Sequence, residues 1–121
     1  MNPCPPRAAV LMCHAPIVIP PIGKARAKDC AATTEAMKAA ALAVARSGAG
    51  TVVVVSPHTP RHRQAFGCVT GEELYGDFSA FGVPGLEATF RNDVEAGAAI
   101  SRGAAQAGLS TAPADVRGLD H

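Results

Sequence analysis

Two histidines follow the two most apolar extended segments of this chain. Residues 8–13 lead into His14, and residues 51–57 lead into His58. Two buried strands with one helix between them form a crossover unit in which the strands run parallel. Ligands of open α/β sheets bind at the carboxyl edge of the strands, so we expect both imidazoles in one crevice. This arrangement predicts a metal site with His14 and His58 as ligands.

The other two histidines fit a ligand role less well. His62 follows His58 by four residues, which is the spacing of one helical face, but Pro57 and Pro60 disfavour a helix there. We therefore expect His62 near the site or on the surface. His121 ends the sequence, and terminal residues are usually frayed.

Composition predicts a single globular domain over residues 1–121, with 48% hydrophobic and 17% charged residues. The net charge of +1 argues against nucleic acid and anionic membranes as partners. The longest apolar run, residues 39–45, is far below the ~20 residues that cross a bilayer, so we expect a cytoplasmic protein. The cysteines lack C-x-x-C spacing and are expected to be reduced, buried thiols.

The elements around the histidines can be assigned from local patterns. Prolines and Gly23 predict an irregular loop over residues 15–23, and residues 25–47 predict a helix that Gly48 ends. The apolar stripe of this helix comprises Cys30, Thr33, Met37, Ala41 and Val44. The continuous β-branched run at residues 52–55 is typical of a central strand that is covered on both faces.

The second half of the chain predicts strands, one helix and a long loop. Residues 64–70 are expected to form a strand that pairs antiparallel at one side, and residues 86–90 and 109–112 to form further strands. Asn92 or Asp93 is a good N-cap for a helix to about residue 107. The Gly-rich residues 71–85 are expected to form a loop, and residues 115–121 a turn. The resulting fold class is α/β, with three layers and a mostly parallel central sheet flanked by helices.

Three aromatic side chains fall within the expected loop at residues 71–85. They are Tyr75, Phe78 and Phe81. Such rings can line a pocket for a flat aromatic ligand, or they can fasten the loop onto the sheet. The sequence leaves both interpretations open, so substrate-binding residues are not assigned.

Four short motifs resemble those of the class III extradiol ring-cleavage dioxygenases, in particular their B-type subunit. The branch most similar is the one associated with Ammecr, Memo and radical-SAM proteins. The motifs are HAPIVIP at residues 14–20, SPHTP at 56–60, GDFSAFG at 76–82 and LDH at 119–121. The resemblance extends over essentially the whole chain, which corresponds to the N-terminal half of the family domain.

This resemblance implies an enzyme that uses Fe(II) and O2 to cleave a catechol-type aromatic diol. In the family, two histidines and a glutamate from the C-terminal half hold the iron, so His14 and His58 would be the two imidazole ligands. His121 matches a histidine that acts near the substrate as an acid/base catalyst. None of the nearby carboxylates occupies the glutamate's motif; these are Glu72, Glu73, Asp77 and Asp120.

A second hypothesis is a non-catalytic module of the same fold that binds a metal or a protein partner. Two protein ligands hold Fe(II) weakly, and a half domain leaves a sheet edge uncovered. A homo-oligomer or a complementing chain would then cover that edge. A carboxylate at the metal would favour the enzyme. A hydrolytic zinc enzyme fits poorly, because the sequence has no H-E-x-x-H motif.

Overall fold

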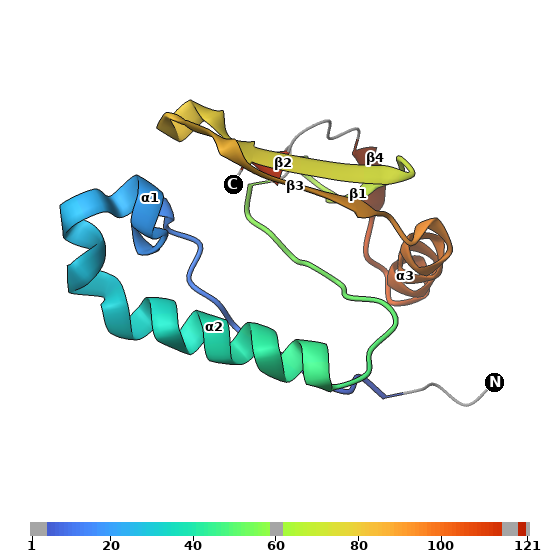
Figure 1. The fold of residues 1–121 in the computed structure, drawn as a ribbon. Helices are drawn as coiled ribbons and strands as arrows, with labels where there is room; N and C mark the ends of the chain where they lie inside the picture. The colour runs from blue at the N-terminus through green and yellow to red at the C-terminus, as the bar shows by residue number, and fades with distance from the viewer. Residues whose placement is uncertain (1–4, 59–61, 115–118, 121) are drawn as a thin grey trace. The chain divides into compact units, whose positions relative to one another are not determined.

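The computed structural model describes residues 5–58, 62–114 and 119–120. The chain divides into two compact units, Met1–Val53 and Val54–His121, and each is described by itself. Within these ranges it is a mixed α/β structure with two long helices and a small parallel sheet (Figure 1). None of the described helices is long and apolar enough to cross a membrane.

A long helix dominates the first unit. The 3-10 helix η2, Lys24–Cys30, continues into the α-helix α2, Ala31–Arg46 (Figure 1). The predicted helix over residues 25–47 is therefore confirmed, and Gly48 ends it at φ 69°. The half-buried positions of α2 are Thr34, Met37, Ala40 and Val44. The predicted stripe was thus right for Met37 and Val44, whereas Thr33 and Ala41 are exposed.

Two short helices precede η2, where an irregular loop was expected. They are η1, Pro16–Val18, and α1, Pro20–Gly23. Each begins with a proline, whose fixed φ suits the first helical position. The chain folds tightly here, since a Cβ on Gly23 would lie 2.2 Å from the carbonyl oxygen of Ile17. Val18, in η1, is buried, with 5% of its surface exposed.

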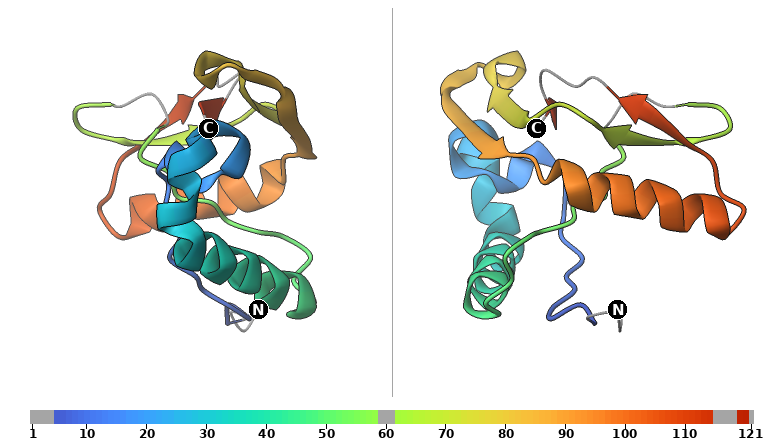
Figure 2. Two further views of the ribbon diagram at one scale, coloured as in Figure 1. Left: turned by 60° about the vertical axis from the view of Figure 1, so that its left-hand side comes forward. Right: turned by 90° about the vertical axis from the view of Figure 1, so that its right-hand side faces the viewer.

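The second unit contains a small parallel sheet with a helix beside it. Strand β1, Phe66–Val69, pairs in parallel with β4, Thr111–Ala114. Helix α3, Val94–Gln106, contacts both strands (Figure 2). The antiparallel pairing that was expected for residues 64–70 is wrong. The partner of β1 is β4, a strand that follows α3 in the chain, and not the hairpin that follows β1 directly.

A hairpin forms the rest of the second unit. Strand β2, Glu73–Phe78, pairs antiparallel with β3, Val83–Arg91, and the 3-10 helix η3, Ser79–Phe81, connects them. The loop expected over residues 71–85 is therefore wrong. Among the glycines of residues 71–85, Gly82 is the one with a positive φ, 76°, and it lies where the main chain reverses direction. The two-residue strand β5, Leu119–Asp120, pairs in parallel with β2, where a turn was expected.

Helix α3 is confirmed at both ends. The side chain of Asp93 accepts a hydrogen bond of 3.0 Å from the backbone N–H of Ala96, as an N-cap does. Gly108 follows the helix at φ 76°. The strand after α3 begins two residues later than the predicted residues 109–112.

The predicted strands at residues 8–13 and 51–55 are absent from the structure, although both segments are described. Both are irregular and solvent-exposed: Leu11 is 101% exposed and Val55 is 92% exposed. Apolar and β-branched residues favour extended backbone, but a strand also needs a neighbour that accepts and donates ladder hydrogen bonds. No described segment supplies such a neighbour to either run.

The cysteine prediction is confirmed in part. Cys13, Cys30 and Cys68 carry free thiols. Burial was the wrong expectation for Cys13, which lies on the irregular segment before His14 and is exposed. Cys30 and Cys68 are half-buried, and Cys4 lies outside the described residues.

Candidate metal-binding segments

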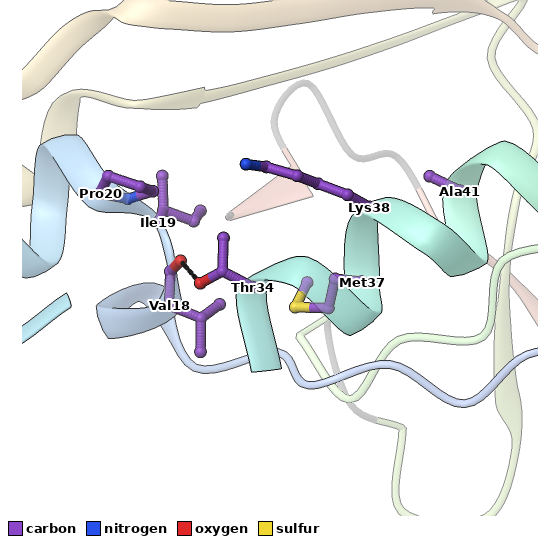
Figure 3. A pocket seen from close by; sticks show the side chains of 7 residues that line it. All are labelled: Val18, Ile19, Pro20, Thr34, Met37, Lys38 and Ala41. Carbon is purple, nitrogen blue, oxygen red and sulfur yellow. Dashed lines mark hydrogen bonds between the residues drawn. The ribbon is translucent and has the colours of Figure 1, made fainter. Parts of the chain in front are cut away.

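His14 follows the exposed segment over residues 8–13 and is itself exposed. The backbone that follows it is held in place by hydrogen bonds. The N–H of Val18 donates to the carbonyl of Ala15 over 3.2 Å, and the hydroxyl of Thr34 donates to the carbonyl of Val18 over 2.7 Å (Figure 3). Helix α2 therefore fixes the turn that begins one residue after His14.

An open apolar groove of about 260 Å³ lies between this turn and α2 (Figure 3). Its lining residues are Val18, Ile19, Pro20, Thr34, Met37, Lys38 and Ala41. Lys38 is the one charged residue of this lining, and its Nζ lies 2.8 Å from a carboxylate oxygen of Glu35. The groove thus offers mainly apolar contact, because its two polar side chains, Thr34 and Lys38, are bonded to Val18 and Glu35.

His58 belongs to the second unit and is half-buried in a turn. Its backbone N–H donates to the hydroxyl oxygen of Ser56 over 3.2 Å, and Pro57 between them restricts the backbone further. The rest of the SPHTP motif, Thr59 and Pro60, lies outside the described residues. His62 is exposed and not helical, as predicted.

The convergence of His14 and His58 stays a prediction, because the two residues belong to different units. Over residues 5–58, 62–114 and 119–120, no group of three or more His, Cys, Asp or Glu side chains forms a metal-binding cluster. Two imidazoles are suitable ligands for Fe(II). His121 lies outside it, as does the side chain of Asp120.

A polar cluster occupies one face of the β2–β3 hairpin. The hydroxyl of Tyr75 donates to the carboxylate of Glu87 over 2.9 Å, which raises the pKa of Tyr75 to about 12, and the nearby Asp77 acts in the same direction. Asp77 lies opposite Glu87 in the strand register. Hydrogen bonds from the hydroxyl and the backbone N–H of Ser79 lower the pKa of Asp77. Asp77 is therefore held in its charged form.

The aromatic residues of the hairpin do not form a single group of rings. Phe78 and Phe81 contact each other with centroids 6.2 Å apart and ring planes tilted by 56°. Phe81 is 41% exposed. Tyr75 instead directs its hydroxyl to Glu87. These contacts favour the interpretation in which the phenylalanines fasten the η3 turn.

Pairing of β5 with β2 brings two of the four motif segments together. Gly76 lies beside Leu119, and Asp77 lies beside Asp120. Sequence reasoning missed this pairing, because a two-residue strand has no periodicity that a pattern can detect. The GDFSAFG segment and the LDH segment therefore share one sheet up to residue 120.

No protein-family model matches the chain, and no solved structure matches it. Protein CA_C1420 of Clostridium acetobutylicum is similar, at 29% identity over 76 residues. The match covers 63% of this chain and 16% of that protein. The chain therefore spans about a sixth of the relative's length, and the relative's name states no activity.

Proposed function

We propose that this chain is part of a cytoplasmic Fe(II)-dependent class III extradiol dioxygenase, of the B-type subunit family, with a three-layer α/β domain. Its substrates would be a catechol-type diol and O2. His14 and His58 would be the imidazole ligands, and a carboxylate outside the described residues would complete the site. The observation that carries the proposal is that each histidine follows an apolar segment and adjoins a turn fixed by hydrogen bonds.

Each residue of the proposed site has a defined task. The restrained backbone at His14 and His58 would help to hold both imidazoles in place, as a metal site requires. Bound Fe(II) would supply adjacent positions for the diol oxygens and O2. His121 would take a proton from the diol and return it later, because an imidazole titrates near neutral pH.

The β2–β5 pairing supports the assignment of His121. It brings residues 119–120, which precede His121 directly, beside Gly76 and Asp77. If His121 acts on the substrate, the η3 end of the hairpin would then border the same site. The motifs alone did not predict that residues 119–120 lie beside Gly76 and Asp77.

Iron binding tests the proposal. The purified chain is titrated anaerobically with Fe(II) in a calorimeter as wild type and as H14A, H58A and H62A. We expect H14A and H58A to lose binding and H62A to retain it, because a ligand histidine supplies a bond that alanine cannot replace. Equal binding by wild type, H14A and H58A would overturn the assignment of both ligands.

Turnover distinguishes the enzyme from a second candidate, a non-catalytic metal-binding or partner-binding module. That candidate is favoured because none of the carboxylates of this chain occupies the motif of the family's iron-binding glutamate. The Fe(II)-loaded chain is mixed with a panel of catechols and O2 and followed for the yellow ring-opened product. Product formation that H121A abolishes supports the enzyme, whereas iron binding without product supports the module.

A further inference from the structure

Strand β3 lies at the edge of its sheet. The strand order is β3-β2-β5, so β2 occupies one side of β3 and no described strand occupies the other. Edge strands of natural proteins usually carry proline or lysine, or are very short, because a free edge pairs with other chains. β3 has nine residues, with a proline only at Pro84. The stretch from Leu86 to Arg91 contains neither proline nor lysine.

Hydrogen bonding to β2 determines which backbone groups of β3 face the free edge. The N–H of Asn92 donates to the carbonyl of Glu72 over 2.8 Å, so these two residues form a hydrogen-bonded pair. Hydrogen-bonded and non-hydrogen-bonded pairs alternate along an antiparallel ladder. The N–H and C=O groups of Glu87, Thr89 and Arg91 therefore point away from β2.

We propose that β3 pairs antiparallel with β3 of a second copy of this chain, about a twofold axis at Thr89. In this register Thr89 lies opposite Thr89 of the partner subunit. Glu87 lies opposite Arg91 of the partner subunit, and the same contact recurs on the other side of the axis. The residues that pair are those whose backbone groups are directed to the free edge.

The charges on one face of the sheet indicate that the strand that pairs with β3 is β3 of a second copy. Glu87 lies opposite Asp77 in the hairpin, and like charges that face each other across strands are destabilising. No described cation forms an ion pair with either carboxylate. The partner subunit's Arg91 would place a guanidinium beside Glu87. Arg91 itself would then lie between Glu73, its neighbour in β2, and Glu87 of the partner subunit.

On the other face of the sheet, the same pairing would cover an exposed aromatic side chain. Phe90 is 63% exposed, although it lies within a strand. In the proposed register, Phe90 lies opposite Ala88 of the partner subunit, whose small side chain leaves room for the ring. The strand therefore carries a self-complementary pattern on both faces.

Charge reversal tests the register. Sedimentation velocity is measured on the full chain as wild type, E87R, R91E and E87R/R91E. Each single variant places like charges at two symmetry-related positions, so we expect a dimer dissociation constant at least about tenfold higher than that of wild type. E87R/R91E restores opposite charges and recovers the dimer. E87R mixed with R91E is expected to form a heterodimer, because all charge pairs are then complementary.

Two further variants serve as controls. R102E makes the same charge change on α3 and should leave the dimer unchanged. T89P removes an N–H at the free edge, where β2 needs no donor, so it should abolish the dimer while circular dichroism stays as in wild type. A wild-type chain that is monomeric at all concentrations would overturn the proposal and leave the edge to a strand of another protein. Dimers that persist in E87R and R91E would also overturn it.

Discussion

Tyr75 is a specific ultraviolet probe of the hairpin, because the sequence contains one tyrosine and no tryptophan. Its hydroxyl donates to Glu87, which raises its pKa from the ordinary value of 10.0 to about 12. We expect the ultraviolet absorbance of the phenolate to titrate with a midpoint near this raised value. In E87Q the midpoint should fall towards 10.0, because the negative charge that opposes ionisation is removed.

The same shift determines how the hairpin responds to alkali. A raised pKa in the folded state gives stability that is complete below the unfolded pKa of 10.0 and is lost as the pH rises through about 12. Y75F, which cannot ionise, should not show this loss. A phenolate midpoint at the ordinary value in wild type would contradict the Tyr75–Glu87 hydrogen bond.

Single residues were predictable where their partners are close in the sequence. The cap at Asp93 was expected from its residue type, because the N–H that it accepts from lies three positions later. The partner of Tyr75 is twelve positions away, and only the strand register identifies it. The turn after His14 was expected to be irregular, and no local pattern indicated that Thr34 would hold it.

At the scale of elements, α3 depends on its N-cap. D93A removes the carboxylate that accepts from the N–H of Ala96, and we expect a loss of about 1 kcal/mol in the free energy of unfolding. Urea denaturation followed by circular dichroism measures this loss. D93N is the matched control, because asparagine caps as well as aspartate does. Equal losses in D93A and D93N would show that Asp93 acts through its charge and not as a cap.

The fold of the first unit depends on close approach at Gly23. In G23A the new Cβ would meet the carbonyl oxygen of Ile17 at 2.2 Å and the Cβ of Ala27 at 2.9 Å. Overpacking of this kind costs about 1–3 kcal/mol, which urea denaturation measures. G50A is the control, since a Cβ on Gly50 would meet no atom within 4 Å. A fully stable G23A chain would contradict the tight turn.

Helices were predictable from the sequence to a greater extent than strands. The helices at residues 25–47 and 93–107 follow from a local period and from their terminal residues, and the structure contains both. The strands at residues 8–13 and 51–55 were inferred from apolar residues alone, whereas a strand exists only as part of a pair. The strand predicted at residues 86–90 is confirmed within β3, whereas β2 was missed because glycines at 71, 76, 82 and 85 suggested a loop.

For the whole molecule, the main feature is how little side-chain surface the described residues bury. Among the hydrophobic residues described, Val18, Ala27 and Ala114 are the buried ones, and all three are small or medium in size. We expect the isolated chain to bind a hydrophobic dye such as ANS and to unfold with an enthalpy well below that of an ordinary globular domain. Fluorescence and scanning calorimetry measure these properties. A sharp transition with an enthalpy near about 0.7 kcal/mol per residue would contradict this expectation.

The candidate site was predictable only in its parts. Residue types and spacing singled out His14 and His58, and the structure shows what restrains the backbone at each. Whether the two imidazoles meet depends on how the two units are placed, which local patterns do not encode. The proposed carboxylate ligand would come from a residue far away in the sequence, so local patterns do not identify it either.

The hydroxyl of Thr34 has a consequence for mutational scans of this protein. Helix α2 carries neither of the two candidate metal ligands, yet through Val18 and Ala15 it holds the main chain next to His14. If His14 binds the metal as proposed, a substitution such as T34V in this alanine-rich helix would weaken metal binding as the loss of a ligand does. A scan that measures metal binding alone would therefore assign α2 wrongly to the metal ligands.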